Sequence, residues 1–276
     1  MVRARHRIPG VPAVLSLTVA CWLGGAFTEA AERPAPDLPA GRKAYEQHCA
    51  RCHGDLGKGD GLDAKRFYPR PRDLSLGIYK FRSTASGTPP SDDDLFDTIT
   101  QGLPGSNMPD WQQLNEATRW QLVEYLKSLS PVFQQTPPTP VEIAKDPGAA
   151  QADAAKGRDA YEQLGCAACH GASGRANGPS AAGLVDDWGM PIRPADLTQG
   201  WSYRGGHSPK AVMVRVLTGI DGAGMPSYTG AVTPEDAWQL AYYVASLQQT
   251  PVWRYLVSVA TVRGELPGAV DDARWA

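Results

Sequence analysis

The stretch Cys49-Ala50-Arg51-Cys52-His53 returns later in the chain as Cys166-Ala167-Ala168-Cys169-His170. In each copy two thiols stand three positions apart, and an imidazole follows directly. The chain has only five cysteines and five histidines in 276 residues, so chance would rarely produce this pentapeptide even once. Two copies therefore indicate that both segments serve the same chemistry.

The chemistry that needs this pattern is covalent attachment of c-type haem. The two thiols can form thioethers with the haem vinyl groups, and the adjoining histidine can then bind the iron. A zinc knuckle would need four clustered ligands, and a thioredoxin-like pair would not need the histidine. We therefore predict two haem c groups, attached through Cys49 and Cys52 in the first copy and through Cys166 and Cys169 in the second.

The similarity of the two copies extends well beyond the motif, which indicates a duplicated domain. GRKAYEQHCARCHG at 41–54 matches GRDAYEQLGCAACHG at 157–171, apart from the insertion of Gly165. Three more pairs of blocks follow in the same order. They are RPRDL and RPADL at 70–74 and 193–197, NMPDW and GMPSY at 107–111 and 224–228, and RWQLVEYLKSL and AWQLAYYVASL at 119–129 and 237–247.

One methionine in each half stands at the same distance from its motif histidine. Met108 follows His53 by 55 positions, Met225 follows His170 by 55 positions, and a proline comes next in both cases. A thioether would fill the sixth coordination position of the iron, favour the reduced state and leave no position for a substrate. We predict His53/Met108 and His170/Met225 ligation of the two irons, with Met190 as the alternative ligand in the second half.

Other residues are expected to support these sites. The carbonyl of Pro71 in the first half, and of Pro194 in the second, is expected to accept the N–H of the proximal imidazole. Arg82 and Arg204 have two open interpretations, contact with haem propionates or solvation on a packed aromatic ring. Met213 stands in an apolar helix-like run and is expected in the core.

Apolar periodicity predicts that both halves are mostly helical. A helix at about 40–50, and another at about 153–165, would lead into each attachment motif. A closing helix follows each methionine. Asn115 is the expected cap of the first closing helix, and Thr233 with Pro234 marks the start of the second.

The N-terminal segment, 1–31, has the features of a cleavable signal peptide. Three arginines precede a largely apolar run, and Thr28-Glu29-Ala30 offers small residues at a cleavage site. An uncleaved membrane anchor is the alternative. We expect an exported, periplasmic protein without a transmembrane segment in the mature chain. The formal net charge of −2 gives no basic field for nucleic acid.

The remaining boundaries follow from the repeat and from composition. The two domains are expected at 32–130 and 153–249. The proline-rich segment 131–152 between them predicts a semi-extended linker without packed elements. The tail, 250–276, begins with an apolar run that is too short to span a bilayer.

The two Cys-x-x-Cys-His-Gly motifs, the Pro-x-Asp-Leu blocks, the Met-Pro pairs and the closing helices resemble the class I c-type cytochrome family in its tandem, dihaem form. The resemblance covers about 40–130 and 153–248. It implies an all-α fold of two small helical bundles around covalent haem c. It also implies one-electron relay between respiratory redox partners, as a free shuttle or as an electron-transfer subunit.

Two further function hypotheses stay open. The terminal sequence GELPGAVDDARWA, 264–276, is similar to the opening of the haem-b-binding subunit domain of ethylbenzene dehydrogenase-type molybdoenzymes. This similarity implies a molybdopterin-type or terminal respiratory enzyme as a partner. The alternative to a carrier is a dihaem enzyme, such as a peroxidase or thiosulfate dehydrogenase, which needs one haem with a displaceable or non-methionine ligand.

Overall fold

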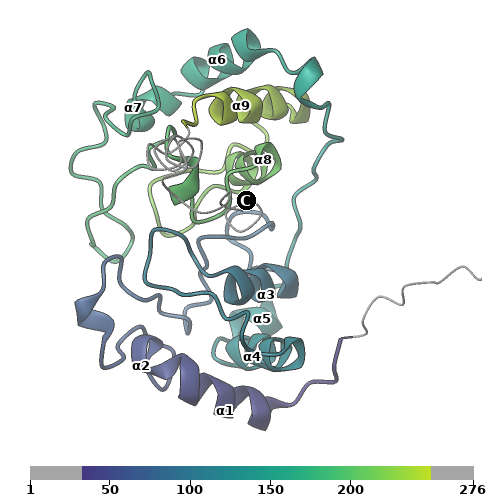
Figure 1. Ribbon diagram of the computed structural model, residues 1–276, viewed down its shortest axis with the longest axis vertical. Helices are drawn as coiled ribbons and strands as arrows, with labels where there is room; N and C mark the ends of the chain where they lie inside the picture. The colour runs from purple at the N-terminus through teal and green to yellow at the C-terminus, as the bar shows by residue number, and fades with distance from the viewer. Residues whose placement is uncertain (1–32, 250–276) are drawn as a thin grey trace, which may run out of the picture. The chain divides into compact units, whose positions relative to one another are not determined.

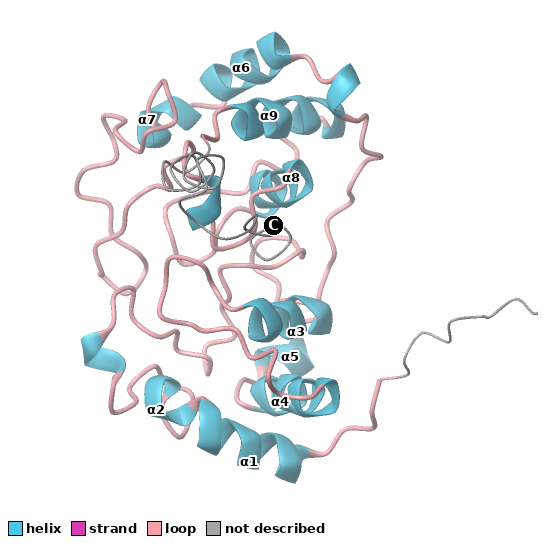
Figure 2. Cartoon of the chain, viewed as in Figure 1, coloured by secondary structure: helices cyan, strands magenta, loops and turns pink. Residues whose placement is uncertain are grey.

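The computed structural model describes residues 33–249, and every regular element in this range is a helix (Figure 1, Figure 2). The all-α prediction is therefore confirmed. The elements are α1 (Leu38–His48), α2 (Ala50–His53), α3 (Asp92–Gln101), α4 (Glu116–Ser128), α5 (Val132–Gln135), α6 (Ala154–Gln163), α7 (Cys166–His170), α8 (Pro209–Thr218) and α9 (Pro234–Ser246), with 3₁₀ turns η1 (Ala64–Arg66), η2 (Ala149–Gln151) and η3 (Gly200–Ser202). The predicted signal peptide and the C-terminal tail lie outside the described residues.

The closing helices begin where the sequence predicts. The Asn115 side chain accepts the Thr118 N–H at 2.8 Å and caps α4. The Thr233 hydroxyl accepts the Asp236 N–H at 3.1 Å, and Pro234 occupies the first position of α9. A side-chain acceptor for a free N–H at a helix start typically stabilises the helix by about 1 kcal/mol. Among the described residues, no helix has the length and apolar character that a bilayer span requires.

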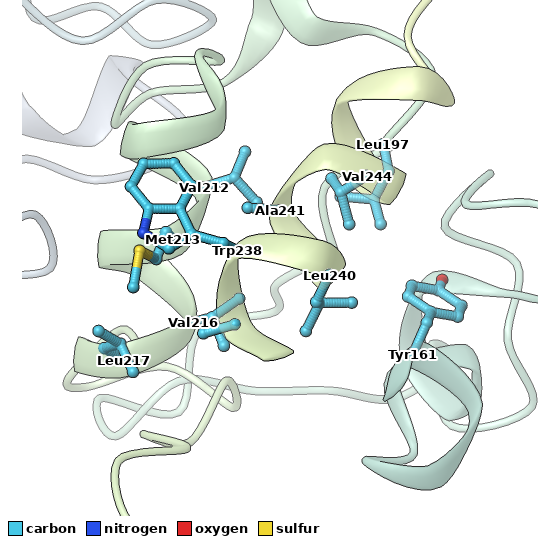
Figure 3. Close-up of a cluster of buried hydrophobic side chains, with 11 residues drawn as sticks. Tyr161, Leu197, Val212, Met213, Val216, Leu217, Trp238, Leu240, Ala241 and Val244 are labelled. Atoms are coloured by element: carbon cyan, nitrogen blue, oxygen red, sulfur yellow. The ribbon is translucent and has the colours of Figure 1, made fainter. Parts of the chain in front are cut away.

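Each half has its own hydrophobic core, built on the same helix pair. In the first half α1 packs against α4, and in the second α6 packs against α9, with α8 on the other side of α9 (Figure 1). The buried side chains of the second core gather around α8 and α9 (Figure 3). Met213 is fully buried among them, which confirms its prediction as a core residue.

A glycine lies at each of the two corresponding helix crossings. A Cβ atom added to Gly41 would lie 3.0 Å from the Cβ of Tyr125 on α4. A Cβ added to Gly157 would lie 2.6 Å from the Cβ of Tyr243 on α9. The absence of a side chain therefore allows α1 and α6, which lead into the attachment motifs, to approach their closing helices closely.

We expect Gly157→Ala to lower the free energy of unfolding by about 1–3 kcal/mol, because the added methyl group would force α6 away from α9. Helix propensity alone predicts the opposite sign, a gain of about 1 kcal/mol. Denaturant unfolding followed by tryptophan fluorescence measures the change. A more stable Gly157→Ala protein would contradict the close approach of the two helices.

The expectation that 131–152 contains no packed element is wrong. The segment includes α5 and η2, and the Phe133 ring packs edge-on against Tyr79 with 5.9 Å between ring centroids. The Ala144 carbonyl accepts the indole N–H of Trp238 at 3.0 Å. Proline content suggested an extended spacer, but apolar residues between the prolines give the segment side chains that pack on both cores.

Polar contacts join the two halves, which belong to one compact unit. The side chain of Arg82 is completely buried, and its Nη2 lies 2.8 Å from the Asp221 carboxylate of the other half. Asp221 also accepts the Ser86 hydroxyl at 2.7 Å and the Gly87 N–H at 2.9 Å. Of the two interpretations of Arg82, neither describes its main contact, because the structure pairs this guanidinium with Asp221.

Candidate haem-binding sites

The two attachment motifs reach the same helical conformation by different routes. In the first half α1 ends at His48, Cys49 keeps a helical conformation, and α2 follows directly. In the second half the inserted Gly165 adopts a left-handed conformation with φ of 73° before α7 begins. Because glycine reaches this region without steric cost, the insertion is absorbed in one turn. The four motif cysteines are free thiols.

Both proximal histidines are oriented by a backbone carbonyl. The Nδ1 of His53 lies 3.0 Å from the Arg72 carbonyl oxygen, and the Nδ1 of His170 lies 2.9 Å from that of Ala195. The expected acceptors, Pro71 and Pro194, are wrong by one residue. In the first half the Pro71 carbonyl lies against Gly59 instead, where an added Cβ would be only 2.7 Å away.

The orientation of these imidazoles suits an iron ligand. Since Nδ1 donates to a carbonyl, Nε2 carries the lone pair that a metal needs. Burial lowers the pKa of His53 and of His170, which keeps both rings neutral at neutral pH. A neutral imidazole is the form that binds iron.

A large cavity lies beside the second attachment motif. Its volume is about 850 Å³, within the range of about 300–1,000 Å³ typical of cofactor sites. Cys166, Cys169, His170 and Met225 all line it, and so does Met190, the alternative ligand. The structure thus brings the predicted donor set of the second half to one cavity. The choice of Met225 as the axial ligand stays a prediction.

The methionine loops of the two halves are held by equivalent backbone bonds. The carbonyl of Met108 accepts the Leu103 N–H at 3.0 Å, and that of Met225 accepts the Ile220 N–H at 2.9 Å. Three residues after each methionine, Trp111 and Tyr228 donate their N–H groups to Ile99 in α3 and Val216 in α8, at 3.1 and 3.0 Å. Met108 therefore lies in the same local setting as Met225, and its ligation also stays a prediction.

Several buried donors fit a group that carries carboxylates. The Tyr79 hydroxyl and the Trp111 indole N–H of the first half are buried without a protein acceptor. The Nε of Arg215, a residue on the cavity wall of the second half, is in the same situation. A buried donor without a partner costs about 1–3 kcal/mol, and haem propionates would supply the missing acceptors. The residues present therefore fit a haem.

Four cations from both halves line the same cavity. Arg204 is there, as one of its two interpretations required, together with Arg72, Lys80 and Arg215. Burial lowers the pKa of Arg72 and of Arg215 to about 10, so both stay charged at neutral pH. The sequence analysis missed the other three cations. The arginine inside the RPRDL block was the one available signal.

Comparisons with known proteins match each half separately. Residues 36–126 match the family described as "Cytochrome C oxidase, cbb3-type, subunit III", and residues 154–248 match the family "Cytochrome c". Two curated relatives are Cbb3-type cytochrome c oxidase subunits CcoP, from Azospirillum sp. (strain B510) and Azospirillum brasilense. Each is 30% identical to this chain, over 219 and 216 residues respectively. The matches cover 76% of this chain and 62% of the length of each relative.

A solved structure extends the comparison to three dimensions. It is that of the Kuenenia stuttgartiensis reducing HAO-like protein complex Kustc0457/Kustc0458, one chain of which is 41% identical to this protein with a TM-score of 0.74. The match covers 79% of this chain and all of the other. Cytochrome c domains imply covalently bound haem c, the chemistry for which both Cys-x-x-Cys-His motifs are placed. The helical repeat and these matches agree, and the chain belongs to the c-type cytochromes as a tandem of two cytochrome c domains.

Proposed function

We propose that this protein is an exported dihaem cytochrome c that relays single electrons between redox proteins. His53 with Met108, and His170 with Met225, would hold the two irons. The observation that supports this proposal most directly is the cavity of the second half, where His170 and Met225 lie with both motif cysteines. The bound haem supplies a reversible one-electron couple.

The surroundings of the proposed ligands favour a carrier over an enzyme. The imidazole of each half is fixed by a backbone carbonyl, and each methionine lies in a loop tied by backbone bonds to α3 or α8. A methionine held in this way would keep the sixth coordination position filled, so no substrate could enter it. This arrangement argues against the alternative of a peroxidase or a thiosulfate dehydrogenase.

The relatives support a role within a larger redox assembly. Two of them are named as subunits of a cbb3-type oxidase, and the structural relative comes from an HAO-like protein complex. We infer a periplasmic subunit or shuttle whose partners are respiratory redox enzymes, of the terminal or molybdopterin type. The segments 1–31 and 250–276 would then serve export and docking.

The purified holoprotein tests this function. We expect two haems per chain, two reversible one-electron transitions in a potentiometric titration, and no carbon monoxide binding in the reduced state, since both irons keep two protein ligands. N-terminal sequencing of the exported protein should give a start after Ala30. Rapid carbon monoxide binding at one centre, or turnover of peroxide or thiosulfate, would support the dihaem enzyme instead.

A further inference from the structure

The turn that covers the first attachment motif forms a small, ordered and cationic surface. The 3₁₀ turn η1 lies against α2, and the Asp63 N–H donates to the Arg51 carbonyl at 3.1 Å. Leu62, at the start of this turn, is 80% exposed. We call the surface made by Arg51, Leu62, Lys65 and Arg66 the η1 face. It adjoins Cys52 and His53, and thus the edge at which the first haem would be attached.

Two arginines of the η1 face are held in place by one buried carboxylate. Asp63 is only 8% exposed, and its carboxylate binds Arg51 Nε and, at 3.0 Å, Arg66 Nη1. Both arginine side chains nevertheless remain largely exposed, at 69% and 74%. Asp63 therefore fixes their positions while the other guanidinium N–H groups point to solvent. With the exposed Lys65, the face carries a net positive charge around an apolar side chain.

The second half contains the same backbone arrangement without the charges. The Ser180 N–H donates to the Ala168 carbonyl at 2.8 Å, as the Asp63 N–H donates to that of Arg51. Ala168 thus corresponds to Arg51, and Ser180 to Asp63. The remaining positions of the face correspond to Pro179, Ala182 and Gly183, so the equivalent surface is neutral. The cationic surface is a property of the first half alone, and the fold does not require it.

We propose that the η1 face is the docking surface for an acidic redox protein that exchanges electrons with the first haem. The inference rests on the proposed electron-relay function. A protein interface commonly has an apolar centre and a polar rim, as Leu62 and its cationic neighbours provide. Carboxylates on the partner would complement three exposed cations and accelerate encounter by electrostatic attraction. The neutral face of the second half would leave that half to a partner of different surface chemistry.

The test uses the reduced holoprotein and a small acidic copper protein, plastocyanin, whose Cu(II) takes one electron per encounter. At low ionic strength we expect Arg51→Gln/Arg66→Gln to react roughly three- to tenfold more slowly than the wild type, with a weaker salt dependence. Arg158→Gln is the matched control, because it removes an arginine that is 67% exposed and paired with Glu162 in the second half. It should stay within about twofold of the wild type.

Further arms separate the proposal from its alternatives. Lys65→Gln leaves both Asp63 ion pairs in place and should slow the reaction in the same direction, so the result does not depend on folding of the double variant. The cationic oxidant tris(phenanthroline)cobalt(III) should show no slowing. Equal rates for Arg51→Gln/Arg66→Gln and Arg158→Gln would overturn the proposal, as would loss of binding to phosphatidylglycerol vesicles without a change in rate. A failed potentiometric titration of the wild type would instead overturn the relay function itself.

Discussion

Asp221→Ala is expected to lower the free energy of unfolding by about 3–5 kcal/mol, the usual cost of removing one partner from a buried ion pair. The side chain of Arg82 is 0% exposed, and Asp221 is the carboxylate that balances its charge at 2.8 Å. Arg215, which donates to the Arg82 carbonyl at 3.3 Å, is a second buried cation nearby. Without Asp221, both guanidinium groups would remain in a poorly solvated interface.

Urea unfolding of the holoprotein, followed by haem absorbance and by tryptophan fluorescence, measures this change. Because Asp221 also accepts bonds from Ser86 and Gly87, its loss should weaken the contact between the halves and separate their unfolding transitions. Asp159→Ala, at an exposed position of α6, is the control and should change stability by less than about 0.5 kcal/mol. A loss below about 1 kcal/mol for Asp221→Ala would show that the interface is solvated.

Local features of the sequence predicted much of this structure. The caps at Asn115 and Thr233 are short-range signals, and both closing helices begin there. The repeat doubled the information, because a residue that recurs in register, such as Met108 with Met225, can be separated from incidental ones. Met213 could be assigned to the core from its apolar neighbours alone.

The features that sequence analysis missed depend on contacts between distant residues. Arg82 and Asp221 lie in different halves without equivalent partners, so neither periodicity nor the repeat marks them as a pair. The histidine acceptor was wrong by one residue because the Pro71 carbonyl lies against Gly59, a contact that no local pattern encodes. The packing of 131–152 depends likewise on both cores.

Met225→Ala is expected to abolish the methionine-to-iron charge-transfer band of one oxidised haem and to leave that of the other unchanged. The potential of the affected centre should fall by on the order of 0.1 V, a modest part of the ≈0.8 V range that axial ligands span. The fall follows because a thioether stabilises ferrous over ferric iron. The loop itself should persist, since its bonds to Ile220 and from Tyr228 to Val216 use backbone atoms.

Met190→Ala is the matched control, because Met190 lines the same cavity and is the alternative ligand. If Met225 binds the iron, Met190→Ala should keep both charge-transfer bands and both potentials. The reverse result, loss of one band in Met190→Ala alone, would move the axial ligand to Met190. Met108→Ala should reproduce the Met225→Ala result at the other centre. A band and potential that persist in every single variant would mean that the corresponding haem lacks a methionine ligand, and an open coordination position would then favour the dihaem enzyme.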